Sequence, residues 1–265
     1  MANLPEPYNE SFLPLIQKFY SLEAIAREPW DPSTILFVPL KKQILLENGG
    51  AETFATVIYL SILNLNFEIK RVKNVNEISP SGRGPLLKCG KYSIGEYESI
   101  VNFSNLKGYR LLANFLDSSK KNEIKSYMLL IQSSYSDTLN YFLWKSDGVQ
   151  KAIKESFSSD YPWPLNIILY WNEYYFKRKY LQSNNLWDLK KDKVMHRFSE
   201  VNECLNKKLK DNAYLMGNNM TEVDILLYSF IKVLTINSVF EELNASLGDL
   251  THLRDYFAKM DQNMA

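Results

Sequence analysis

The sequence predicts a small unit of strands and helices, followed by a unit made of helices alone. The segment Ile78–Phe103 has the pattern of a turn, two short strands joined by a tight connection, and a helix. Upstream of it, two strand-like segments are separated by a stretch with helical periodicity. From about Tyr109 onward, one helical pattern follows another. These three observations indicate an α/β plus all-α fold class.

Composition narrows the class of protein. At 265 residues, the chain is long enough for two small domains, and 46% hydrophobic and 14% aromatic residues are typical of a well-packed protein. The net charge of +1 argues against a global field that attracts nucleic acid or an anionic membrane. Cys89 and Cys204 form no CxxC motif and favour free thiols in a reducing compartment. His196 and His252 stand alone and predict neither a metal site nor a catalytic triad.

The first elements lie before this central segment. Ser11–Glu28 has an amphipathic pattern and predicts a helix, which Pro29 and Pro32 end. Thr34–Val38 is rich in β-branched and aromatic residues and predicts the first strand, with Ile44–Leu46 as the alternative.

A second helix and a second strand follow. Helical periodicity over Ala51 to about Asn64 predicts the helix. Its buried side is expected to carry five apolar residues, namely Phe54, Val57, Ile58, Ile62 and Leu65. Phe67–Val72 alternates apolar and charged residues, which indicates a half-exposed strand.

The central segment predicts a hairpin and a helix. Pro85 stands at the start of the first strand, where a proline removes no ladder hydrogen bond. A cis Gly84–Pro85 bond would leave the backbone of Gly84 unpaired on the ligand side, whereas an ordinary trans proline is the alternative. Cys89-Gly90 predicts the tight connection to the second strand. The helix that opens at Gly95-Glu96 has four apolar positions at roughly helical spacing, Tyr97, Ile100, Val101 and Phe103.

The second half predicts five helices, Lys120–Trp144, Leu165–Leu181, Asp188–Asp211, Glu222–Phe240 and Leu247–Met260. Thr221 and Asp224 have the spacing of a capping box at the start of the fourth helix. The apolar run Ile225–Phe240 contains Lys232 and is shorter than the roughly 20 residues that a membrane-spanning helix needs. We therefore expect a helix buried in a helical domain, and no membrane-spanning segment.

The elements divide the chain into three expected regions: a helical extension over residues 1–30, an α/β domain over residues 31–108 and a helical domain over residues 109–265. The α/β domain has the thioredoxin-like order of elements. Together with the helical domain it resembles the glutathione transferases. The residues that mark this fold are Pro85, Glu96, Thr221 and Asp224.

The chemistry of that superfamily is missing. Glutathione transferases activate a thiol with a Ser, Tyr or Cys just after the first strand. The stretch from Phe37 to Glu52 contains no Ser, Thr, Tyr, Cys or His, and Thr53 is expected inside the helix. Where the superfamily holds glutathione with an acidic or Gln residue followed by Ser, this chain has Glu96-Tyr97. We therefore expect no catalytic residues, no metal and no cofactor.

The segment Tyr161–Asn166, YPWPLN, has two interpretations. In the first, Trp163 fills the helical core at a helix start, where Pro164 suits the first turn; we favour this one for Trp163. In the second, the aromatic residues form a rigid anchor for a partner protein. The candidate partner contacts are Tyr161, Trp163, Tyr170, Trp171 and Tyr174.

Segments spread over about residues 28–240 resemble the metaxin family of the same superfamily. They are Glu28–Trp30, Gln43–Leu46, Ser79–Gly82 with Pro85, Gly95–Val101, Lys125–Met128, Tyr161–Asn166, Lys177–Lys179 and Thr221–Asp224. Gly84 is a departure, because the family usually has a β-branched residue before this proline.

This resemblance implies a non-catalytic protein at the cytosolic face of the mitochondrial outer membrane. Metaxins take part in inserting β-barrel proteins there, beside the membrane-embedded sorting barrel. The resemblance also implies peripheral attachment through a metaxin 1-like partner. Metaxins have been linked as well to motor adaptors that transport mitochondria. The alternative, which the scaffold and Glu96 leave open, is a divergent glutathione-dependent transferase.

Overall fold

The computed structural model describes residues 28–40, 50–73, 75–111 and 118–264. The predicted helix before residue 28 and the alternative strand Ile44–Leu46 lie outside this range. The first part of the chain contains β1 (Ile35–Val38), α3 (Gly50–Ile62), β2 (Glu68–Arg71), α4 (Val75–Ile78), β3 (Leu86–Cys89), β4 (Tyr92–Gly95) and α5 (Tyr97–Leu106). The second part contains α6 (Ser118–Lys145), α7 (Asp147–Asp160), α8 (Leu165–Ser183), α9 (Lys191–Leu209), α10 (Glu222–Ile236), a 3₁₀ turn (Ser238–Phe240), α11 (Glu241–Leu247) and α12 (Thr251–Met264).

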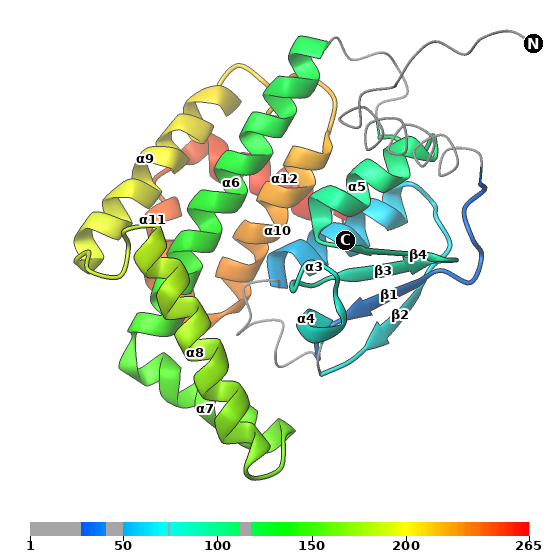
Figure 1. Ribbon diagram of the computed structural model, residues 1–265. Helices are drawn as coiled ribbons and strands as arrows, with labels where there is room; N and C mark the ends of the chain where they lie inside the picture. Colours follow the sequence, from blue (N-terminus) through cyan, green and yellow to red (C-terminus); the bar gives the residue numbers. More distant parts are fainter. Residues whose placement is uncertain (1–27, 41–49, 74, 112–117, 265) are drawn as a thin grey trace, which may run out of the picture.

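Four strands form one mixed sheet in the order β2-β1-β3-β4 (Figure 1). β1 pairs parallel with β2 and antiparallel with β3, and β3 and β4 form a hairpin in which Cys89 lies opposite Tyr92. Gly90 in the connection has a φ of +58°, which suits a tight hairpin turn. The predicted first strand and hairpin are thus confirmed. The second strand is confirmed as well, but the prediction that it is half-exposed was wrong, because all four residues of β2, at the edge of the sheet, are exposed.

Helix α3 lies between the sheet and the helical part, where it packs most extensively against α10 (Figure 1). Its most buried positions include Ala51, Ala55, Tyr59 and Leu60. The five residues predicted to be buried differ in their exposure. Ile62 is exposed, and Leu65, which lies beyond the end of the helix, is buried. The remaining three, Phe54, Val57 and Ile58, are half-buried. The predicted buried face of α3 is therefore confirmed only in part, because Phe54, Val57 and Ile58 pack against the core without being fully buried. Small side chains permit a short distance between helix axes, so a buried face does not require large apolar residues.

The start of α10 is held by the buried carboxylate of Asp224. Its Oδ2 accepts hydrogen bonds at 2.8 Å from the backbone N–H and the hydroxyl of Thr221, and its Oδ1 accepts one at 2.9 Å from the N–H of Leu215. The hydroxyl of Tyr256 on α12 donates to Oδ1 at 3.1 Å. The predicted capping box is confirmed. Asp224 also connects α10 to the preceding loop and to α12.

Several helical segments differ from the prediction, and α11 is one that was not predicted. Helix α7 occupies a stretch in which none was predicted. The helix predicted over Glu222–Phe240 ends at Ile236, because the Asn237 side chain accepts a hydrogen bond from Val239 N–H and starts a 3₁₀ turn. No single helix in the described ranges is long and apolar enough to cross a membrane. α10 and Ser238–Leu247 meet that criterion only as a pair bent by 98°.

Candidate functional site

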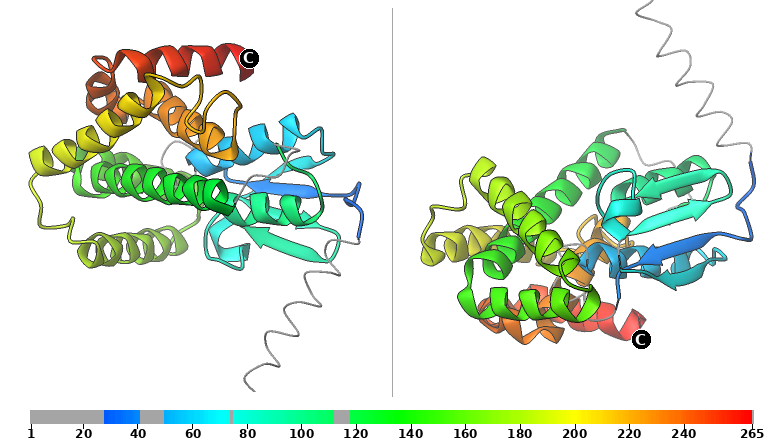
Figure 2. Two further views of the ribbon diagram at one scale, coloured as in Figure 1. Left: turned by 90° about the horizontal axis from the view of Figure 1, so that it is seen from above. Right: turned by 60° about the horizontal axis from the view of Figure 1, so that its bottom comes forward.

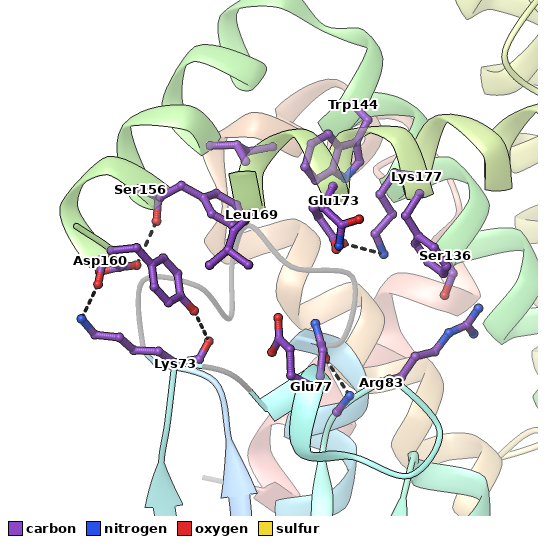
Figure 3. Close-up of a pocket in the computed structure, with 18 of the residues that line it drawn as sticks. Lys73, Glu77, Arg83, Ser136, Trp144, Ser156, Asp160, Leu169, Glu173 and Lys177 are labelled. Carbon is purple, nitrogen blue, oxygen red and sulfur yellow. Dashed lines mark hydrogen bonds and ion pairs between the residues drawn. The ribbon is translucent and has the colours of Figure 1, made fainter. Parts of the chain in front are cut away.

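A cavity opens between the α/β part of the chain and helices α6, α7 and α8 (Figure 3). Glu77 and Arg83 extend toward it from the sheet side, and Trp144, Leu169 and Glu173 line it from the helices. Its volume is about 120 Å³. Typical small-molecule sites measure roughly 300–1,000 Å³. The space enclosed by the described residues is therefore smaller than that of a typical small-molecule site.

Glu52, the third residue of α3, is the buried acid of this cavity, with 5% of its surface exposed. Its Oε1 accepts a hydrogen bond from Gln132 Nε2 at 2.8 Å, and its Oε2 has no hydrogen-bond partner among the described residues. The pKa of the Glu52 carboxyl is raised to about 7, mainly by burial. The charge of Glu96 also raises this pKa, whereas the hydrogen bond from Gln132 and the charge of Arg83 lower it. The nearby backbone N–H of Tyr97 also lowers this pKa, although it makes no hydrogen bond to Oε2.

Helix α6 presents a row of residues at four-residue spacing behind this acid, Gln132, Ser136, Asn140 and Trp144. Ser136 and Trp144 line the cavity. The buried amide of Asn140 has no hydrogen-bond partner for either of its polar atoms among the described residues. Sequence reasoning missed this row and Glu52. The sequence gives little signal for it, because other polar residues, such as Ser133 and Asp137, lie between these positions.

The cations around the cavity already have contacts. Lys177 forms an ion pair with Glu173 at 3.4 Å. Lys73 Nζ donates a hydrogen bond to the backbone carbonyl of Asp160 at 2.5 Å (Figure 3). The guanidinium of Arg83 lies over the ring of Tyr180, 5.9 Å from its centre. Glu52 consequently has no ion-pair partner within the part of the chain that the structure describes.

The backbone edge at Gly84 is covered by α4. The Gly84–Pro85 bond is cis. A cis bond was expected to leave the backbone of Gly84 unpaired. That expectation is wrong for the N–H of Gly84, which donates a hydrogen bond to the side-chain Oδ1 of Asn76 at 2.9 Å. A Cβ on residue 84 would lie 2.2 Å from Cγ1 of Val75, which explains why glycine stands here instead of a β-branched residue. Side chains of α4 thus occupy this side of the proline.

Tyr97, at the position where the superfamily has a small hydroxyl residue, is part of the core. Its hydroxyl donates to the backbone carbonyl of Glu222 at 2.8 Å, and its ring packs edge-on against Tyr59. Burial raises the pKa of the Tyr97 hydroxyl well above its usual range. Thr53 lies inside α3, as predicted, and is buried. Tyr97 therefore joins α5 to α10 and does not face a ligand.

Helix α8 lies on the outside of the helical part (Figure 2), and exposed apolar side chains form a face on it and on the turn before it. We call it the α8 face and define it by Trp163, Ile168, Trp171 and Tyr175. The last three have helical spacing and expose 59%, 44% and 61% of their surfaces. Trp163 is 79% exposed, so the prediction that it fills the core is wrong. The core position at this end of α8 belongs to Tyr170, which packs edge-on against Phe157.

The five predicted partner contacts differ in how exposed they are. Trp163 and Trp171 are exposed, and Tyr174 is half-buried with its ring edge-on to Trp171. Tyr161 is half-buried and its hydroxyl donates to the backbone carbonyl of Lys73 at 2.9 Å. Tyr170 is buried and cannot contact a partner. Within the described residues, no group of three His, Cys, Asp or Glu side chains has the geometry of a metal site.

Comparison with known proteins adds family information. The family described as outer mitochondrial membrane transport complex protein, Tom37, matches residues 53–174, and the glutathione S-transferase C-terminal domain matches residues 188–262. Human metaxin-2 is 27% identical over 253 residues, which cover 94% of this chain and 95% of that protein. The metaxin-2 homologue of Caenorhabditis elegans is 29% identical over 218 residues, which cover 81% of this chain and 93% of that protein.

Solved structures show the same fold. Glutathione S-transferase III in its apo form aligns with a TM-score of 0.56 and 14% identity over 86% of this chain and 91% of its own. Glutathione transferase F7 from Populus trichocarpa aligns with a TM-score of 0.55 and 13% identity over 86% and 92% of the two chains. The predicted fold class is thus confirmed. Along most of its length this chain is thus similar to metaxin-2 proteins, and its fold is that of the glutathione transferases.

Proposed function

We propose that this chain is a non-catalytic adaptor subunit of a protein import complex at the mitochondrial outer membrane. The family that matches residues 53–174 is described as a transport complex protein of that membrane, and the curated relatives are metaxins. The finer assignment is that the chain attaches to the cytosolic face through a metaxin 1-like partner. It would act there in the sorting and assembly of β-barrel proteins.

The observation that carries this proposal is the exposed α8 face. Aromatic side chains such as Trp171 and Tyr175 dominate the binding energy of many protein interfaces. They provide large contact areas at a low cost in side-chain entropy. Contiguous exposed apolar surface on a soluble domain marks an interaction site more often than isolated apolar residues do. The N-terminal part of this helix also lies within the region matched by the transport complex family.

The cavity gives independent support for a non-catalytic role. Asn76 on its α/β side already accepts the hydrogen bond from the N–H of Gly84. The hydroxyl of Tyr97 is committed to the core. A thiol-activating side chain between Phe37 and Glu52 is missing from the sequence itself. The proposal therefore assigns the scaffold to protein binding.

A copurification experiment tests the α8 face. The tagged chain carrying Ile168→Ser and Tyr175→Ser is expressed in cells, and proteins are recovered from detergent extracts of the outer membrane. We expect recovery of the metaxin 1-like partner and of the sorting barrel to fall by about tenfold or more, as loss of interface anchors implies. Matched controls are Leu129→Ser and Ile236→Ser, which change similarly exposed residues on α6 and α10. A wild-type chain that recovers neither partner, or an equal loss with the controls, contradicts the proposal.

The second candidate is a divergent glutathione-dependent transferase. The observations that favour it are the cis Gly84–Pro85 bond and the position of Glu96 at the start of α5. Calorimetric titration with reduced glutathione, followed by a turnover assay with an electrophilic substrate, distinguishes the two. Submillimolar binding with turnover would replace the adaptor proposal by the enzymatic one.

A further inference from the structure

We propose that the cavity between the α/β part and helices α6–α8 is a binding site for the guanidinium group of an arginine side chain presented by another polypeptide. This inference goes beyond the adaptor role, because it concerns a different surface from the α8 face. It rests on a buried acid, on the walls of the cavity and on the contacts of the cations around it.

The buried acid supplies the first argument. Glu52 is buried, and one of its two carboxylate oxygens lacks a partner among the described residues. A buried polar atom without a hydrogen bond costs about 1–3 kcal/mol, which makes such atoms rare in folded proteins. Glu52 lines the cavity, and a donor that reaches this oxygen, which has less than 1 Å² of accessible surface, would remove this cost. Guanidinium has five N–H donors in a planar fork that matches a carboxylate, and it donates without accepting.

The walls supply the second argument. The helical side of the cavity combines polar side chains with aromatic and aliphatic ones, among them Trp144, Phe157, Tyr161 and Leu169. A guanidinium is weakly hydrated and stacks on aromatic faces, and the methylene stem of an arginine packs on apolar surface. The volume of about 120 Å³ suits one such side chain. Glu77 also lines the cavity, whereas the charge of Glu173 is balanced by Lys177.

The contacts of the surrounding cations supply the third argument. Lys177 is paired with Glu173, Lys73 donates to the carbonyl of Asp160, and Arg83 lies over Tyr180. Each of these cations has a contact that holds it away from Glu52 Oε2. Arg83 is nevertheless close enough to lower the pKa of Glu52, so it opposes an incoming cation by charge repulsion. Its removal should therefore strengthen binding.

The test is a titration of the full chain with N-acetylarginine N-methylamide, followed by nuclear magnetic resonance at the indole N–H of Trp144. The matched probe is the citrulline analogue, which keeps the shape of arginine and loses the charge. We expect saturable shifts with the arginine compound and binding of the citrulline compound that is weaker by about tenfold, the range of a charge-assisted hydrogen bond. Equal affinity for the two probes, or no saturable shift with either, would overturn the proposal.

Three variants locate the site. Glu52→Gln keeps the shape and the acceptor for Gln132 and should weaken arginine binding to the citrulline level. Glu77→Gln makes the same change at an exposed position of the same cavity, and should alter binding by less than about twofold. Arg83→Gln should strengthen binding. If Glu52→Gln binds arginine as tightly as the wild type, Glu52 is not the receptor and the proposal fails. The probe comparison on the wild-type chain needs no variant and decides the matter even if Glu52→Gln does not fold.

Discussion

Replacing Glu52 by Gln should change how the free energy of unfolding depends on pH. Burial raises the pKa of the Glu52 carboxyl from its ordinary value of 4.5 to about 7 in the folded chain. In the unfolded chain the carboxyl is in water and recovers its ordinary pKa. The folded state therefore binds this proton more tightly than the unfolded state does. Consequently the wild-type chain loses stability as the pH rises from 4.5 through about 7.

The size of the effect follows from the shift. Each pKa unit corresponds to about 1.4 kcal/mol, so a change from 4.5 to about 7 amounts to about 3 kcal/mol. Below pH 4.5 the carboxyl is protonated in both states and the whole contribution is present. Above about pH 7 it is ionised in both states and the contribution is gone. Little of this is lost to solvent screening, because only 5% of Glu52 is exposed.

The assay is urea unfolding of the wild type and of Glu52→Gln at several values between about pH 5 and 8. The quantity of interest is the difference between the two free energies of unfolding at each pH. Burial also raises the pKa of Asp224 and Glu222, but both titrate in either protein and cancel in the difference. Arg83 and Glu96 are the charged groups that act on Glu52, so neither residue is substituted in the two proteins that are compared.

Parallel curves for the two proteins would refute the reasoning. They would mean that Glu52 titrates near its ordinary pKa and reaches water in the folded state. A difference that grows with pH in the wild type's favour would refute it as well, since it would require a stabilising partner for the carboxylate.

The remaining predictions concern stability and are measured by urea unfolding. In each case the slope of the free energy of unfolding against urea concentration is expected to stay the same. Asp224→Ala should cost about 3 kcal/mol, because it leaves buried donors unpaired, against about 1 kcal/mol for Thr221→Ala; equal losses would contradict the network around Asp224. Gly84→Ala should cost about 1–3 kcal/mol by overpacking against Val75, and combination with Val75→Ala should restore part of it; strict additivity would be the contrary result. Tyr97→Phe should cost about 1 kcal/mol through loss of the bond to α10, and a neutral outcome would argue against that bond.

Most secondary structure could be predicted because its causes are local. The hairpin at Cys89-Gly90 depends on a glycine with positive φ between two short apolar strands. The capping box depends on a Thr and an Asp three residues apart. Helix α7 was missed because it contains few apolar residues, and Ile153 is the one that is buried among the residues of α7 whose burial the structure describes.

The site was predicted less well, because its features arise from contacts between distant segments. Gln132 is 80 residues from Glu52, and no local pattern shows that the two are hydrogen-bonded. The exposure of Trp163 likewise depends on Tyr170 taking the core position beside Phe157. A sequence pattern can identify apolar residues, but it cannot decide which of several neighbouring aromatic residues will be buried.

The amino-acid sequence by itself determined the order of strands and helices, the start of α10 and the lack of a thiol-activating side chain, since each of these depends on residue types at short spacing. Only the tertiary structure decided the character of the segment Ile78–Phe103. There Asn76 binds the N–H of Gly84, Val75 fills the space of a Cβ, and Tyr97 bonds to α10. It also decided that Glu52 is buried, with one carboxylate oxygen that has no partner among the described residues, and that the α8 face is exposed. The physical reason is that burial and hydrogen-bond partners are set by which elements pack together, and those elements are far apart in the chain.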